Sequence, residues 1–308
     1  MVICVLLAHG CSGARDVLDL NEYSERSVAS IYNEALAILY EERYGDAAKL
    51  FEEVERQYPY SWWATKAQMM AAFAYYHINE YQDAILTADR FIGLHPGHRY
   101  VPYAYYLKGM SYYEQIKDVA RDQRDTELAL DTFRQLVDRY PESIYAQDAV
   151  AEKIDVLIDN LAGKEMEIGR FYLKRGKDIA ALNRFNKVIR DYDETIHVVE
   201  ALHRLVESYL RLGLVEQAKK AAAVLGHNYP KSEWYSDSYY LLASKGLVGE
   251  GRADRVRPGA ISVRNIRPGD LDLEDDGKAT LLTLWQQLLD EDDTGFRERL
   301  AEKQQDVR

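Results

Sequence analysis

The chain has 308 residues, of which 47% are hydrophobic and 29% charged, so it can bury a sizeable core. Its formal net charge of −12 argues against a surface built for nucleic acid or for anionic membranes. Seven prolines and 18 glycines over this length favour a helical protein over a β-sheet protein.

The N-terminal segment, residues 1–10, contains a short apolar run from Val2 to Ala8 and ends just before Cys11. A membrane-spanning helix needs about 20 apolar residues, so this run is too short to span a bilayer. It is similar to the end of a bacterial lipoprotein signal peptide, in which a small residue precedes a cysteine that becomes lipidated. The match is partial, because Leu7-Ala8-His9-Gly10-Cys11 has one histidine more than the usual motif.

The cysteine count supports lipid attachment. The sequence contains Cys4 and Cys11 alone, and cleavage before Cys11 leaves it as the single cysteine of the mature chain. An exported protein with one N-terminal cysteine fits lipidation better than disulfide chemistry. We therefore predict a lipid anchor on Cys11 and a polar tether over residues 11–26. The alternative is a cytosolic protein with two incidental cysteines.

The stretch from Trp62 to Pro96 has the pattern of a tetratricopeptide repeat, a 34-residue helix–turn–helix unit. Its two helical phrases meet at Asn79-Glu80, where we predict the turn. Pro96 ends the second phrase, because the residue before a proline avoids helical backbone angles. The same phrase recurs along the chain. An alanine stands twelve residues before the stop in five units: Ala47/Pro59, Ala84/Pro96, Ala129/Pro141, Ala181/Asp193 and Ala218/Pro230.

The units differ mainly in their first helical phrase. In the first unit we predict the turn at Gly45-Asp46, and in the third a charged insert over residues 115–125 lengthens the unit. The fourth unit opens with a helix to about Leu161, followed by a second helical phrase from Lys164 to Leu173. Its stop is Asp193 instead of proline, so we expect this helix end to be less sharply fixed.

These phrases predict an all-α fold, a right-handed solenoid of five tetratricopeptide-like helix pairs over residues 27–245. Ser232 to Ala243 is the predicted helix that caps the open end of the array. Beyond it we predict a flexible C-terminal extension, made of a linker over 246–276 and an amphipathic helix with a charged tail over 277–308. That helix would dock on a partner, which we favour, or fold back on the array.

No motif in the sequence indicates an enzyme. The chain has no Gly-rich phosphate loop, no His-Glu-x-x-His, no Gly-x-Ser-x-Gly and no cysteine pair for zinc. His95 and His98 suggest a metal ion, but Pro96-Gly97 between them predicts a loop, and no further ligands follow at suitable spacing. We therefore predict no catalytic, cofactor or metal site and no nucleic-acid partner.

A family resemblance is carried by short phrases distributed over residues 28–230. They are Tyr58-Pro59-Tyr60, Ala74-Tyr75-Tyr76, Asp89-Arg90-Phe91-Ile92, His95-Pro96-Gly97-His98, Asp122-Gln123-Arg124-Asp125, Tyr140-Pro141-Glu142-Ser143, Phe171-Tyr172, Asn183-Arg184 and Arg190-Asp191-Tyr192. In their order and spacing, behind a lipoprotein-like cysteine, they resemble the BamD family, outer-membrane lipoproteins of the bacterial β-barrel assembly machinery. Residues 246–308 extend beyond the minimal family length, and the resemblance implies nothing about them.

The resemblance implies a non-enzymatic scaffold, lipid-anchored at the periplasmic face of the outer membrane. In this family the C-terminal repeats dock on the periplasmic domains of the barrel protein BamA, together with other lipoproteins of the complex. Carried over by motif, Arg184 with Asn183 is the expected BamA contact, and Arg175 with Gly176 is the second candidate. Arginine suits the contact because its guanidinium can fork onto a carboxylate. The alternative is that Arg184 is a solvated residue at the edge of a helix.

The N-terminal repeats of the family are thought to meet unfolded outer-membrane proteins. We predict that four tyrosines, Tyr75, Tyr76, Tyr103 and Tyr106, line a groove that contacts these substrates. The alternative is that these tyrosines are structural, which is the commoner use of tyrosine in helix pairs. For the whole chain, the second hypothesis is a different periplasmic repeat adaptor, a lipoprotein of cell division or secretin assembly.

Overall fold

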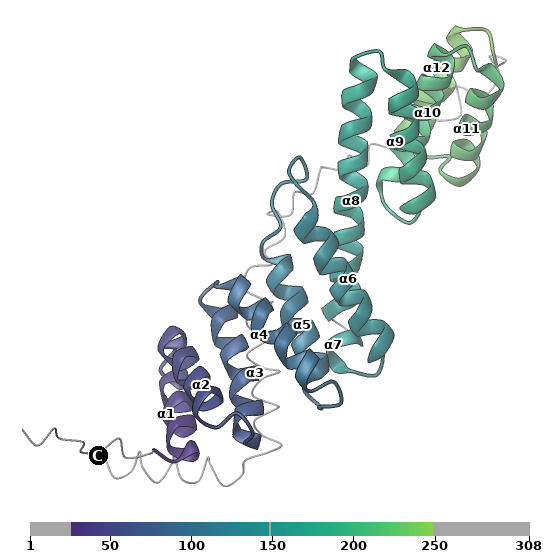
Figure 1. Cartoon of the computed structure of the whole chain (residues 1–308). Coiled ribbons are helices and arrows are strands. Elements are labelled where there is room, and N and C mark those ends of the chain that lie inside the picture. The colour runs from purple at the N-terminus through teal and green to yellow at the C-terminus, as the bar shows by residue number, and fades with distance from the viewer. Residues whose placement is uncertain (1–25, 148, 249–308) are drawn as a thin grey trace, which may run out of the picture. The chain divides into compact units, whose positions relative to one another are not determined.

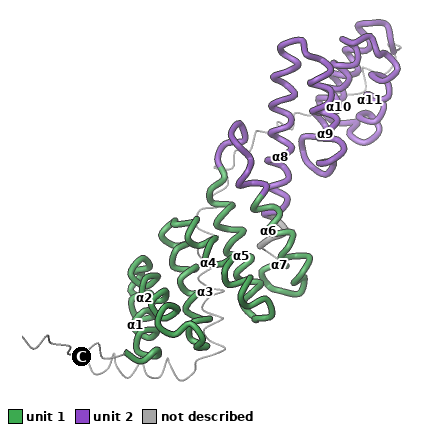
Figure 2. Tube along the Cα trace, in the orientation of Figure 1, with its two compact units in different colours: residues 1–116, 128–151 green, residues 117–127, 152–308 purple. Residues whose placement is uncertain are grey.

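The computed structural model of the chain describes residues 26–147 and 149–248. These residues form twelve α-helices and no strand (Figure 1). They divide into two compact units (Figure 2): unit 1 holds residues up to 116 and 128–151, and unit 2 holds residues 117–127 and those from 152 onward. Cys11, the predicted tether up to residue 25, the linker from residue 249 and the tail helix lie outside the described residues.

The helices follow the five predicted pairs. In chain order they are α1 (Val28–Tyr40), α2 (Tyr44–Gln57), α3 (Trp62–His77), α4 (Tyr81–Leu94), α5 (Val101–Tyr113), α6 (Arg124–Arg139), α7 (Ile144–Gln147), α8 (Ala149–Lys174), α9 (Asp178–Asp191), α10 (His197–Arg211), α11 (Val215–Asn228) and α12 (Glu233–Ser244). Within unit 1 each helix from α1 to α5 packs on the next. Within unit 2, α9 packs on α10, α10 on α11, and α12 on both α10 and α11, so the predicted capping helix is confirmed.

Each helix pair ends in the same turn, in which an amide donates to the carbonyl three residues earlier. The five bonds are Ser61 to Tyr58 at 3.0 Å, His98 to His95 at 2.9 Å, Ser143 to Tyr140 at 3.0 Å, Thr195 to Tyr192 at 3.2 Å and Ser232 to Tyr229 at 3.1 Å. Ser61 and Ser232 also cap the following helix, since their hydroxyl oxygens accept from the amides of Ala64 and Tyr235 at 3.1 Å. The turn thus ends one helix pair and starts the next element.

The stop without a proline has the same geometry. Tyr192, which precedes Asp193, has φ −140° and ψ 41°, close to the −131° and 54° of Tyr229, which precedes Pro230. The Tyr192 amide donates to the Val188 carbonyl at 3.0 Å. The expectation of a less sharply fixed helix end at Asp193 is therefore wrong, because hydrogen bonds in the turn set this end.

The predicted turn of the first unit is also wrong. Gly45 and Asp46 lie inside α2, and the chain reverses at Glu42, whose φ is 60°. A carboxylate in the first turn of a helix is stabilised by the helix dipole, and Asp46 also pairs with Arg43 at 2.7 Å. The predicted turn at Asn79-Glu80 is confirmed, with a φ of 63° at Asn79.

Helix α8 is one continuous helix of 26 residues instead of the two predicted phrases. Glycine inside a helix costs about 1 kcal/mol relative to alanine, but a larger residue at position 163 would be crowded. A Cβ there would lie 3.1 Å from Nε2 of His197 and 3.4 Å from Cγ1 of Val119. The predicted charged insert is non-helical over residues 115–123, and its last two residues begin α6.

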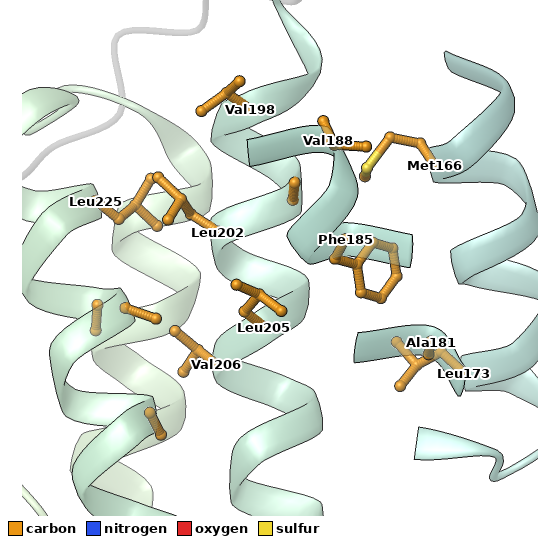
Figure 3. Packing of buried hydrophobic residues seen from close by; sticks show 14 of the residues in the cluster. Met166, Leu173, Ala181, Phe185, Val188, Val198, Leu202, Leu205, Val206 and Leu225 are labelled. Carbon is orange, nitrogen blue, oxygen red and sulfur yellow. The ribbon is translucent and has the colours of Figure 1, made fainter. Parts of the chain in front are cut away.

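The core of unit 2 is organised around Phe185 of α9, whose side chain is fully buried. A Cβ added to Gly169 of α8 would lie 2.4 Å from this ring, so the two helices pack at a distance that only glycine permits. Gly109 of α5 packs on Phe133 of α6 in the same way. Figure 3 shows the apolar cluster around Phe185, formed by Met166, Leu173, Ala181, Val188, Val198, Leu202, Leu205, Val206 and Leu225 among others.

Two smaller observations complete the fold. Leu247 and Val248, at the start of the predicted linker, pack against the core cluster of unit 2 and so belong to the folded unit. Among the helices that the structure describes, none is both long and apolar enough to cross a membrane.

Candidate partner-binding site

The predicted contact residue Arg184 lies on α9 beside a buried carboxylate from α8. Phe185 and Val188 form the buried stripe of α9, so Arg184 and Lys187 lie one position outside it, three residues apart on one face. Glu165 lies one helical turn before Gly169 on α8. Because Gly169 lets α8 approach α9 closely, Glu165 reaches both cations.

The three side chains form a compact ionic cluster. Nη1 of Arg184 donates to Oε2 of Glu165 at 2.9 Å, and Nζ of Lys187 donates to Oε1 at 2.6 Å. The Glu165 side chain is 9% exposed, whereas Arg184 and Lys187 are 39% and 38% exposed. The carboxylate thus lies beneath, and the two cations keep part of their surface in solvent.

Protonation states in the cluster follow from these contacts. Burial raises the pKa of the Glu165 carboxyl, but the hydrogen bonds from Lys187 and Arg184 outweigh it, and the pKa lies below its ordinary value. The hydrogen bond to Glu165 raises the pKa of Lys187. Both groups are therefore charged at neutral pH, and the cluster carries two positive charges and one negative charge.

The other predicted contact residues lie apart from this cluster or beside it. Asn183 is exposed on α9 next to Arg184. Arg175 follows α8, and its guanidinium stacks over the ring of Phe171, an exposed aromatic residue, at 4.2 Å. Arg184 lies six residues into α9, roughly 9 Å along the helix axis from its start. The structure therefore does not bring Arg175 and Arg184 into one contact.

The turn that carries Arg175 is held by a residue from the next helix pair. Gly176 takes the left-handed conformation, with a φ of 69°. Nη1 of Arg211, at the end of α10, donates to the Leu173 carbonyl at 3.2 Å, and its Nε lies 2.9 Å from Oδ1 of Asp178. Arg211 thus joins the end of α8 to the start of α9.

Three of the four predicted groove tyrosines are buried in the helix packing of unit 1. Tyr76, Tyr103 and Tyr106 have at most 1% of their surface exposed, whereas Tyr75 is half-buried. The Tyr76 hydroxyl donates to Oε1 of Glu114 at 3.1 Å. Burial raises the pKa of all four phenols, that of Tyr106 to about 12. Of the predicted set, Tyr75 alone has a side chain that reaches the surface in this structure.

A serine–histidine pair in unit 2 has the composition of a nucleophilic site but not its accessibility. Nδ1 of His203 lies 2.8 Å from Oγ of Ser238, and Nε2 lies 3.8 Å from a carboxylate oxygen of Glu207. A nucleophilic serine must reach its substrate, and Ser238 is fully buried while His203 is 6% exposed. The pair therefore serves to pack α12 on α10.

Sequence reasoning missed Glu165, Lys187 and Arg211 as parts of this region. Charged residues are scattered over every helix, and their spacing along the chain does not identify those that share a partner. Glu165 lies 19 and 22 positions before its two cations. The structure supplies the missing information, because the close packing of Gly169 on Phe185 fixes which turns of α8 and α9 meet.

Comparison with known proteins identifies the family. Residues 24–225 match the family model YfiO, described as an outer membrane lipoprotein. The "Outer membrane protein assembly factor BamD" of Caulobacter vibrioides is 49% identical over 77% of this chain and 77% of its own length. The protein of the same name from Rickettsia prowazekii is 43% identical over 79% of this chain and 94% of its own, and that from Neisseria meningitidis serogroup A is 36% identical over 69% and 83%. This chain belongs to the BamD family.

Proposed function

We propose that this chain is a non-enzymatic scaffold for the assembly of proteins into the outer membrane. The observation that carries the proposal is its identity with proteins named outer membrane protein assembly factor, 49% and 43% over more than three quarters of the chain. The matched residues, 24–225, run from before α1 into α11, so the likeness reaches into each of the five helix pairs.

The finer proposal is that unit 2 docks on the periplasmic domains of a BamA-like barrel protein. Arg184 is the principal contact, Asn183 lies beside it, and Arg175, in the turn before α9, is a separate second contact. The exposed part of Arg184 supports this assignment, because an arginine already held at one nitrogen can offer the rest of its fork to a second carboxylate. Cys11 would carry the lipid that holds the scaffold at the periplasmic face of the membrane.

Capture from solubilised outer membranes tests the function. Cell fractionation should first find the tagged full chain with the outer membrane, as a lipid anchor requires. After solubilisation in detergent, the tagged chain should bring down a BamA-like barrel protein together with other lipoproteins of the assembly complex. Recovery of cell-division or secretin-assembly proteins instead would support the alternative adaptor role and contradict the proposal.

We further propose that unit 1 contacts unfolded outer-membrane proteins through a surface that includes Tyr75. A photo-crosslinking residue at Tyr75 should form adducts with a nascent barrel protein, because this side chain reaches the surface. The same residue at Tyr103, which is 1% exposed, should not crosslink. Tyr240 of unit 2 is 55% exposed and serves as a matched control. Equal adducts at Tyr75 and Tyr240 would mean that the contact is unspecific.

A further inference from the structure

We propose that Glu165 is a positioning residue for the partner contact, and that Arg184 and Lys187 above it together receive one acidic side chain of the partner. This inference rests on the proposed docking of unit 2. It adds Glu165 and Lys187 to the contact, and it predicts that the partner supplies one negative charge. Neither Glu165 nor Lys187 was singled out by the sequence.

The Glu165 carboxylate holds both cations in place. Each oxygen of the Glu165 carboxylate takes one cation, Oε2 from Arg184 and Oε1 from Lys187. The carboxylate is nearly buried and comes from a helix that packs closely on α9, since Gly169 meets Phe185 one turn further on. Two long side chains that keep part of their surface in solvent are thus held at one place before any partner arrives.

Holding both cations in the free protein lowers the entropic cost of binding. Ordering a long side chain at an interface weakens binding, and rigidity in the free protein reduces that cost. Arginine and lysine have among the largest side-chain entropies. Glu165 holds the charged ends of Arg184 and Lys187 in the free protein. Binding of the partner therefore does not have to supply the free energy that orders these two side chains.

The cluster of Glu165, Arg184 and Lys187 is positively charged. Two cations share one carboxylate, which leaves one positive charge in excess. The remaining cation of α9, Arg190, pairs one-to-one with the adjacent Asp191 at 2.6 Å and leaves no excess. One carboxylate of a partner neutralises the cluster of Glu165, Arg184 and Lys187. We therefore expect an aspartate or glutamate, not an aromatic or apolar side chain, at the opposing position.

Substitution of the carboxylate tests the proposal. The full chain in detergent micelles is titrated with the purified periplasmic domains of the BamA-like protein from the same organism. Glu165→Gln keeps the shape but removes the charge, and it should weaken binding about tenfold through lost ordering of two side chains. Glu167→Gln removes the same charge from α8 two residues away and should leave the affinity unchanged. Lys187→Gln, which removes a partly exposed cation, should weaken binding about threefold.

Two further readouts separate positioning from a structural role. In the background Arg184→Gln/Lys187→Gln, the Glu165→Gln change should have no further effect on affinity, whereas a structural defect would persist there. The side-chain Nη–H signals of Arg184 in ¹⁵N-arginine spectra should shift toward those of a free guanidinium in Glu165→Gln, because Nη1 no longer donates to a carboxylate. If Glu165→Gln proves unstable, the Lys187→Gln variant still tests the shared cluster. Its affinity for the partner domains and its arginine spectra are then measured.

The outcomes are distinguishable. Unchanged or tighter binding by Glu165→Gln, with weaker binding by Arg184→Gln, would overturn the positioning role and leave the docking proposal in place. Tighter binding in particular would mean that Glu165 competes with the partner for the cations. Unchanged binding by both variants would reject the docking site itself. Loss in Glu165→Gln that persists without the two cations would assign Glu165 a purely structural role.

Discussion

Replacement of Gly169 by valine should lower the free energy of unfolding of this chain by about 3 kcal/mol. The first added carbon would lie 2.4 Å, 2.8 Å and 2.9 Å from three atoms of the Phe185 ring, which is itself fully buried. The ring cannot turn aside without displacing the cluster shown in Figure 3. Chemical denaturation followed by circular dichroism measures the loss. Gly93→Val on α4, where a Cβ would meet nothing within 4 Å, should change stability by less than about 0.5 kcal/mol.

Substitution of Phe185 tests whether the cost of Gly169→Val comes from the contact between these two residues. Phe185→Ala should cost about 3–5 kcal/mol, since it leaves a cavity in the same core. The two costs should not add, because the valine fills part of the space that the ring vacates. The double variant Gly169→Val/Phe185→Ala is therefore expected to lose less free energy of unfolding than the two single variants lose together. Strict additivity would contradict the packing of α8 on α9 described above.

Arg184→Gln should weaken binding of the BamA-like periplasmic domains at least about 30-fold. Loss of one partner of a hydrogen-bonded charge pair at an interface costs about 2–5 kcal/mol, and 2 kcal/mol corresponds to that factor. Glutamine is preferable to charge reversal, because a glutamate at position 184 would face Glu165 and disturb the fold. Titration of the full chain in detergent micelles against those domains gives the dissociation constants.

Arg190 supplies the matched control for this measurement. It lies on the same helix, its side chain is 76% exposed, and it pairs only locally with Asp191. Arg190→Gln removes the same charge and should change the affinity less than about threefold, the size expected for an exposed ion pair. If Arg190→Gln and Arg184→Gln weaken binding equally, the contact depends on the general charge of α9. An unchanged affinity in Arg184→Gln rejects the site.

The helix pairs could be predicted from the sequence because their determinants are local. The alanines of the repeating frame are all fully buried in the structure, as the pattern requires: Ala47, Ala84, Ala129, Ala181 and Ala218. The helix that caps the array begins one residue later than predicted, with Ser232 as its N-cap. The errors at Gly45-Asp46 and between Leu161 and Lys164 both involve glycines that lie inside helices. A glycine in a sequence usually indicates a turn, but Gly45 and Gly163 both lie within helices. At Gly163 the side chain of His197 packs close to the backbone.

The candidate site was less predictable for a different reason. Arg184 could be chosen from the family motif, but the carboxylate that holds it comes from another helix, and only the packing of α8 on α9 brings the two together. The tyrosines show the same limit. A count of aromatic residues does not reveal which side of a helix faces the core, and Tyr103 and Tyr106 lie inside while Tyr75, one residue before buried Tyr76, reaches the surface.

The link made by Arg211 determines how small a binding fragment can be. Arg211 belongs to the fifth helix pair, yet it bonds to the Leu173 carbonyl and lies against Asp178, the two ends of the turn beside the proposed contact. A fragment cut at Asp193 would retain Arg184 and Glu165 but would lose this clamp, and it would also lose the α10 side of the Phe185 cluster. Mapping of the interface by deletion therefore has to keep α10, or a lost interaction will report on a loosened turn instead of a missing contact.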